Sequence, residues 1–131
     1  MKQIIYAISG YKNSGKTTLT VQLIERLTYM GYKVASIKHD GHDFEDDVPG
    51  TDSYRHKHAG AYGTAVFSKN RVLIHKECEV DETSLIPLFP EADIILLEGF
   101  KNSTYPKYWC DYPNRIPDID QIIQDILKEA K

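Results

Sequence analysis

The chain has 131 residues, of which 41% are hydrophobic and 27% charged, and these values exclude a disordered or fibrous protein and predict a single domain over residues 1–131. The net charge of −3 excludes a broad cationic surface for nucleic acid or anionic lipid, so we expect neither as a partner. Two cysteines are too few for a disulfide scaffold, and the sequence shows neither a signal peptide nor a membrane-spanning run. We therefore expect a cytoplasmic protein.

The N-terminal residues predict a strand, a helix and a second strand. Ile4–Ser9 is a short apolar run that ends at Gly10, which is typical of a buried strand entering a turn. From Gly15 onward apolar residues recur at intervals of three and four, which indicates one buried helix face, and Gly31 is placed to end this helix. The apolar residues are Leu19, Leu23, Leu27 and Met30. Lys33–Lys38 predicts the second strand, and the strand–helix–strand order favours parallel pairing.

The middle of the chain predicts a loop, a short helix and a hairpin. Asp40–Gly50 is polar, acidic and contains glycine, which favours a functional loop. A short helix is predicted over Asp52–Ala59. Tyr62–Phe67 and Arg71–His75 are β-branched and aromatic runs, and the Ser68-Lys69-Asn70 segment between them predicts an antiparallel hairpin because Asn tolerates turn conformations.

The C-terminal part alternates helices and strands. Thr83–Phe89 predicts one or two helical turns, and Asp93–Leu97 is the most apolar strand candidate. An edge strand is predicted near Lys107–Cys110. Pro117 precedes a run of isoleucines at helical spacing, so we expect a closing helix over Asp118–Ala130.

Gly10–Thr17 matches the phosphate-loop pattern of glycine, four residues, glycine, lysine and threonine, placed between the predicted strand and helix. Consecutive backbone N–H groups and a helix N-terminus supply the donors that a polyphosphate needs. Lys16 is expected on the β and γ phosphates, Thr17 on Mg²⁺ and Thr18 on the α phosphate. A glycine-containing turn with a solvated lysine is the alternative. The fold predicted is α/β and P-loop NTPase-like, a mostly parallel sheet flanked by helices with an antiparallel hairpin.

Two acids are candidates for the metal and for hydrolysis. Glu98 ends an apolar strand, where a nucleotide fold needs a carboxylate for magnesium, and Gly99 is positioned to offer its N–H to the γ phosphate. The alternative for Glu98 is a carboxylate that holds the next loop. Asp40 follows the second strand and is a candidate for a magnesium-bound or attacking water. The candidate catalytic residues are Lys16, Asp40 and Glu98, and the candidate metal ligands are Thr17, Glu98 and Asp40.

Four of the five histidines lie between Lys38 and His58. They are His39, His42, His56 and His58. A zinc site would require these pairs to converge through the fold, and a solvated polar loop is the alternative. Arg55 has helical spacing from His58, so it is placed either to approach an anion or to form a surface ion pair.

Four segments together resemble the family of molybdopterin-guanine dinucleotide biosynthesis adaptor proteins, protein B of that pathway. They are Gly10–Leu19, Ile37–Asp40 with His42-Asp43-Phe44, Pro49–His56 through Ala59-Gly60-Ala61, and Leu97–Lys101. Their order and spacing agree from residue 1 to about residue 101. The resemblance implies a GTP-binding homodimer with weak Mg²⁺-dependent GTP hydrolysis. It also implies an adaptor role beside the guanylyltransferase that joins GMP to molybdopterin, with the pterin as a further candidate partner.

The nucleotide-binding residues expected on this basis come from the phosphate loop and from two other places. They are Gly10, Asn13, Ser14, Gly15, Lys16, Thr17, Thr18, Gly99 and Arg55. The chain is shorter than the family pattern, and Pro106–Cys110 lacks the apolar, basic-ended strand expected there. No Asn-Lys-x-Asp motif occurs, so the choice of GTP over ATP follows from the resemblance alone and the base-binding residues stay unassigned.

A P-loop small-molecule kinase is the alternative function. Kinases bring arginines onto the transferred phosphoryl group. The arginines of this chain are Arg26, Arg55, Arg71 and Arg115. They include no clustered pair, which favours the adaptor.

Overall fold

The computed structural model describes residues 2–39 and 50–130. The chain forms two compact units, one made of residues 1–40 and 81–131 and the other of residues 41–80. The single domain predicted over residues 1–131 stays a prediction beside this division. None of the helices in the described stretches has the length and apolar character needed to cross a membrane.

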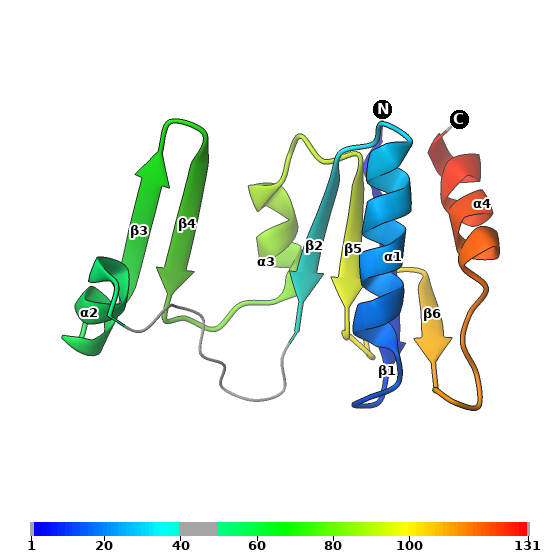
Figure 1. Ribbon diagram of the computed structural model, residues 1–131, viewed down its shortest axis with the longest axis horizontal. Coiled ribbons are helices and arrows are strands. Elements are labelled where there is room, and N and C mark those ends of the chain that lie inside the picture. Colours follow the sequence, from blue (N-terminus) through cyan, green and yellow to red (C-terminus); the bar gives the residue numbers. More distant parts are fainter. Residues whose placement is uncertain (1, 40–49, 131) are drawn as a thin grey trace. The chain divides into compact units, whose positions relative to one another are not determined.

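The first unit is built on a four-stranded sheet in the order β2-β5-β1-β6, and Figure 1 shows this sheet with α1 in front of β1. The strands are β1 (Ile4–Gly10), β2 (Val34–Lys38), β5 (Ile94–Glu98) and β6 (Lys107–Cys110). All three pairings are parallel, so the carboxyl ends of the strands lie at one edge of the sheet. β6 is an edge strand, as predicted.

The register at this edge determines which residues meet. Ile8 of β1 lies opposite Glu98, which in turn lies opposite Lys38 of β2. On the other side of β1, Gly10 lies opposite Cys110. The phosphate loop therefore begins between the strand that ends in Glu98 and the edge strand β6.

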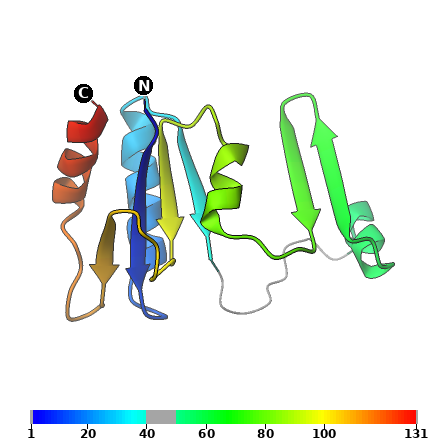
Figure 2. The same ribbon diagram turned by 180° about the vertical axis from the view of Figure 1, so that it is seen from behind.

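Helices cover both faces of this sheet. α1 (Lys16–Tyr29) and α4 (Ile119–Ala130) lie over one face (Figure 1), and α3 (Glu82–Leu85) with the 3-10 turn η1 (Ile86–Leu88) lies over the other, which Figure 2 shows from behind. The side chains of β5 alternate between the two cores. Ile94 and Leu96 pack with α1 and α4, whereas Ile95 and Leu97 pack with Leu85 and Ile86. Burial on both faces explains why this strand is an unbroken apolar run.

Local signals at the ends of these elements are also confirmed. Gly31 has a φ of 96° and follows the last turn of α1. Its N–H donates to the Thr28 carbonyl and the Tyr32 N–H donates to the Leu27 carbonyl, which is the pairing of a Schellman motif. At the amino end of β5, the Asp93 carboxylate accepts from the Lys33 N–H at 2.7 Å. Asp93 thus has a structural role far from the phosphate loop.

The second unit contains α2 (Asp52–His58) and a two-stranded antiparallel sheet of β3 (Gly63–Ser68) and β4 (Arg71–Lys76). Thr51 caps α2 by accepting from the Tyr54 N–H. The predicted hairpin is confirmed. Among non-glycine residues in the described ranges, only Asn13 and Phe100 have positive φ, so Asn70 closes the turn without a left-handed conformation. The α/β fold with parallel sheet, flanking helices and hairpin is confirmed.

Candidate phosphate-binding site

The loop between β1 and α1 is tightly packed and contains residues with positive φ. Gly10, Asn13 and Gly15 have φ values of 155°, 59° and 91°. A Cβ atom placed on Gly10 would lie 2.3 Å from the Cys110 carbonyl oxygen and 2.5 Å from Ser14 Oγ. Such contacts are impossible, so only glycine fits at this position while β6 stays paired with β1.

The loop leaves the N-terminus of α1 open. No side chain caps this helix at Gly15, and its first turn contains no acidic residue. The Ser14 hydroxyl is buried and has no hydrogen-bond partner among the residues that the structure describes. Free N–H groups at a helix start, together with an unpaired hydroxyl, favour a bound anion. A phosphate fits this donor set.

Lys16 lies folded over the loop. Its Nζ donates to the Gly10 carbonyl at 3.0 Å. Burial raises the pKa of the neighbouring Cys110 thiol, and the positive charge of Lys16 lowers it in part. The ammonium group is thus already held beside the phosphate loop, and exchanging one hydrogen bond would direct it to a phosphate.

Glu98 meets the phosphate loop directly. The side chain ends β5 and only 6% of its residue surface is exposed. Thr17 Oγ1 donates to Glu98 Oε2 at 2.9 Å, and Lys38 Nζ lies 3.4 Å from the same oxygen. A hydroxyl and a carboxylate are oxygen ligands of the kind that Mg²⁺ prefers. The structure therefore brings together two of the three predicted metal ligands, and their chemistry fits the ion.

Gly99 is held within the sheet. Its N–H donates to the Ile8 carbonyl at 2.9 Å, and its own carbonyl accepts from Ser9 Oγ at 2.6 Å. A Cβ on Gly99 would lie 3.3 Å from the His39 carbonyl oxygen, and its φ is 101°, so glycine is favoured here for close packing. The assignment of this N–H to the γ phosphate stays a prediction, and it requires the bond to Ile8 to open.

Two predicted site residues are not placed at this edge by the structure. Asp40 lies outside the described residues, as does His42. Arg55 lies on α2 in the second unit. Their roles stay predictions. Within the described ranges, no group of three or more His, Cys, Asp or Glu side chains is arranged to hold a metal ion.

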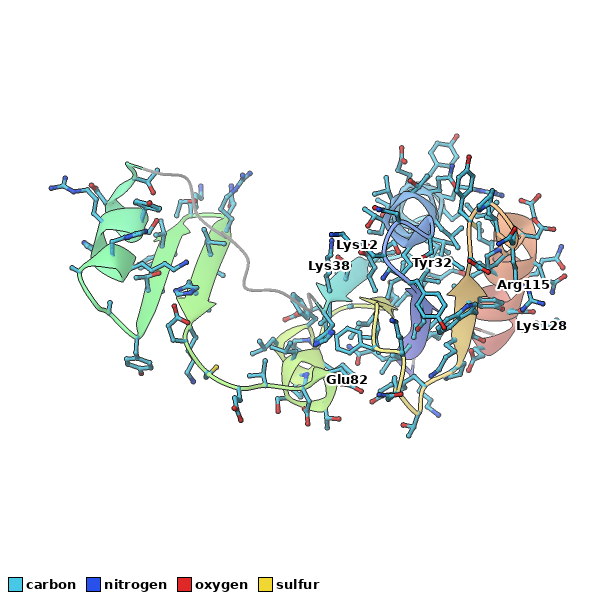
Figure 3. The ribbon with its side chains drawn as sticks, turned by 90° about the horizontal axis from the view of Figure 1, so that it is seen from below. Lys12, Tyr32, Lys38, Glu82, Arg115 and Lys128 are labelled. Carbon is cyan, nitrogen blue, oxygen red and sulfur yellow. The ribbon has the colours of Figure 1, made fainter. Side chains whose placement is uncertain are left out.

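A cavity of about 630 Å³ adjoins the phosphate loop. Its lining consists of Asn13, Ser14, Gly15, Lys16, Thr17, Thr18, Leu19, Gln22, Tyr112 and Ile116. The predicted loop residues from Asn13 to Thr18 thus share one cavity, whereas Tyr112 and Ile116 were not anticipated. Figure 3 views the molecule from below, onto the edge where the parallel strands end, and labels Lys12 and Lys38 there. Lys38 also was not assigned from the sequence, although its place at the end of a strand beside Asp40 was a usable signal.

The model of one protein family, described as molybdopterin guanine dinucleotide synthesis protein B, matches residues 5–110. A "probable molybdopterin-guanine dinucleotide biosynthesis adapter protein" of Bacillus subtilis is 37% identical over 107 residues, covering 79% of this chain and 62% of the relative. A "molybdopterin-guanine dinucleotide biosynthesis adapter protein" of Haemophilus influenzae is 33% identical over 126 residues, covering 91% of this chain and 71% of the relative.

The fold agrees with a solved member of this group. The crystal structure of Bacillus subtilis MobB superposes with a TM-score of 0.70 at 32% identity, covering 92% of this chain and 72% of that one. The chain spans 62% of the length of the Bacillus subtilis adapter relative.

Proposed function

The chain belongs to the family of molybdopterin guanine dinucleotide synthesis protein B, and on that premise we propose that it is a GTP-binding adaptor. In this proposal the phosphate loop binds GTP with Mg²⁺, and the loaded protein assists the guanylyltransferase that joins GMP to molybdopterin. The adaptor itself forms no dinucleotide. Its own chemistry is at most a slow hydrolysis of GTP.

The observation that supports nucleotide binding most directly is the contact between Thr17 and Glu98. It joins the start of α1 to the end of β5 at 2.9 Å, so the hydroxyl and the carboxylate are in place before any ion arrives. Mg²⁺ bound here would neutralise charge on the β and γ phosphates. Lys16 would hold the same phosphates from the other side of the loop, and the N–H groups at the start of α1 would bind their oxygens.

The arginines favour an adaptor over a phosphoryl-transferring kinase. Arg26 is ion-paired with Asp120 of α4 at 2.8 Å. Arg55 and Arg71 lie in the second unit, and the backbone of Arg115 is paired with that of Asp111. A kinase needs cations gathered on the transferred group, whereas no arginine among the described residues lines the cavity beside the phosphate loop.

A titration with GTP in the presence and absence of Mg²⁺ tests the nucleotide part of this proposal. We expect Glu98→Gln to reduce the gain in affinity that Mg²⁺ provides by about tenfold or more, because the amide keeps the shape and removes the charge. The matched control is Glu91→Gln, an exposed glutamate in the turn that precedes β5. Equal weakening with and without Mg²⁺ would mean that Glu98 only holds the loop.

A reconstitution with purified guanylyltransferase, molybdopterin and Mg²⁺-GTP tests the adaptor part. We expect the protein to raise the yield of dinucleotide, to bind the transferase more tightly when GTP and Mg²⁺ are present, and to form no dinucleotide alone. Unchanged rate and yield at every nucleotide concentration would contradict the adaptor role. Phosphorylation of a small acceptor by the isolated protein would favour the kinase instead.

A further inference from the structure

The order of the strands gives the bound nucleotide a direction, on the premise that the proposed function holds. Glu98 lies at the end of β5 on one side of β1, and it contacts Thr17. The metal and the terminal phosphates therefore belong on that side. β6 and the chain that follows it lie on the opposite side of β1, so the nucleoside end of the ligand points toward them.

The cavity has a different character on this second side. One part of its lining is the polar phosphate loop from Asn13 to Thr18, and the rest consists of Leu19, Gln22, Tyr112 and Ile116. Tyr112 is 61% exposed and Ile116 is 56% exposed. Gln22 follows Thr18 by four residues on α1, so the two side chains lie on one face of the helix. Two large apolar side chains thus stand open to solvent next to a phosphate cradle, within a cavity of ordinary ligand size.

Backbone bonds hold this apolar wall in place. The Asp111 N–H donates to the Arg115 carbonyl and the Arg115 N–H donates to the Asp111 carbonyl, each at 2.7 Å, which closes the turn containing Tyr112. The Tyr112 N–H donates to the Ser14 carbonyl at 3.1 Å and ties that turn to the phosphate loop. A Cβ atom on Gly15 would lie 3.7 Å from Tyr112 Cβ. The aromatic side chain therefore starts directly above the loop, and little ordering remains to be done when a ligand binds.

We propose that residues 111–116 form the seat for the base of the bound purine nucleotide. The Tyr112 ring stacks on the base, Ile116 forms the apolar wall beside it, and the Gln22 amide bonds to the nucleoside. Stacking accepts any purine because each has a π-face, and an amide both donates and accepts. The seat thus supplies a binding surface for the base in a chain that lacks the Asn-Lys-x-Asp motif.

Comparing GTP with inorganic tripolyphosphate, which has no base or ribose, isolates this contribution. With Mg²⁺ present, we expect Tyr112→Ala to weaken GTP binding by about 5- to 150-fold while tripolyphosphate affinity changes less than about twofold. Tyr112→Phe keeps the ring and should bind GTP like the unaltered protein. Ile116→Ser should weaken GTP binding in the same selective way. Calorimetric titration measures each affinity, and thermal unfolding checks that each variant folds.

Three outcomes would overturn the seat. They are equal affinity of the unaltered protein for GTP and tripolyphosphate, unchanged GTP binding by Tyr112→Ala, and parallel losses of both ligands in a folded Tyr112→Ala variant. Failure of the unaltered protein to bind either ligand would instead overturn the proposed function, so the two failures are distinguishable.

Discussion

At the scale of single residues, the phosphate loop is defined by what its backbone leaves unpaired. Gly10 permits the approach of Cys110 and Ser14, and the start of α1 has no side-chain cap. The Lys16 ammonium group meanwhile donates a hydrogen bond to the Gly10 carbonyl. A phosphate offers the ammonium a charged acceptor, and charge-assisted bonds are stronger than bonds to a neutral carbonyl. Ligand binding should therefore move this lysine without disturbing the fold.

The first residue-scale prediction is that Lys16→Ala weakens Mg²⁺-GTP binding by about 10- to 150-fold and changes the unfolding free energy by about 1 kcal/mol or less. The large effect follows from the lost ionic bonds to phosphate, and the small one from the single neutral acceptor in the free protein. Calorimetric titration and chemical denaturation measure the two quantities. Lys33→Ala, which removes the same charge at the amino end of β2, is the control. Unchanged GTP affinity in Lys16→Ala would contradict the assignment of this loop as the phosphate-binding site.

At the scale of elements, β6 and α4 are joined by a polar contact above the apolar core. The Tyr108 hydroxyl donates to the Asp125 carboxylate, and the Gln121 amide donates to the same carboxylate at 3.0 Å. The rings of Tyr108 and Tyr6 stack with centroids 5.7 Å apart. Burial, followed by a hydrogen bond with Glu129, raises the pKa of Tyr6 to about 12. Burial and the bond to Asp125 raise the pKa of Tyr108 as well, and that bond lowers the pKa of Asp125.

These raised pKa values predict a loss of stability in alkali. A tyrosine whose pKa is higher in the folded state than the unfolded value near 10 stabilises the fold fully below pH 10, and this contribution declines as the pH rises toward 12. For Tyr6, the part of the unfolding free energy that is lost in this way is roughly 2 to 3 kcal/mol. Urea denaturation between pH 8 and pH 11.5 should show the decline.

Tyr108→Phe separates this effect from general alkaline unfolding. The variant loses the bond to Asp125 and should start less stable at pH 8, but its stability should fall less steeply above pH 10. Tyr29→Phe, at an exposed position, should follow the unaltered protein at every pH. Identical pH profiles for all three proteins would contradict the role of this tyrosine pair.

Much of the element order was predictable because the signals are local. The apolar run of β5 requires burial on both faces, and the leucines of α1 recur at helical spacing. The turn at Asn70 was predictable from its residue type, but its conformation was not, because asparagine tolerates the left-handed region and the backbone here lies outside it. Residue identity restricts φ only weakly for asparagine.

The site was predictable where its residues belong to the motif or end a strand that the sequence itself marks. Thr17 and Glu98 follow from the phosphate loop and from a carboxylate at a strand end. The ion pair of Lys38 with Glu98 and the wall of Tyr112 and Ile116 depend on which strands are neighbours. Parallel pairing joins segments far apart in the sequence, and no local pattern specifies the partner.

At the scale of the whole molecule, the hairpin of the second unit carries large apolar side chains that are exposed among the residues that the structure describes. Two-stranded sheets are marginal in water unless a hydrophobic face is covered. α2 packs against β3. Cross-strand neighbours share a face, so Phe67 with Val72 and Ala65 with Ile74 form one apolar face, and the three large side chains in it are exposed.

We therefore expect two chains to associate through this hairpin face, since exposed apolar patches of this kind mark interaction sites. In sedimentation at micromolar concentration the unaltered protein should have twice the 15.0 kDa mass of one chain. Ile74→Glu should shift it to the monomer, because a carboxylate in an apolar interface loses its hydration. Leu88→Glu is the matched control, since Leu88 of η1 is 64% exposed and Ile74 is 65% exposed, and it should leave the dimer intact. A monomeric unaltered protein, or dissociation by both substitutions alike, would contradict association through the hairpin.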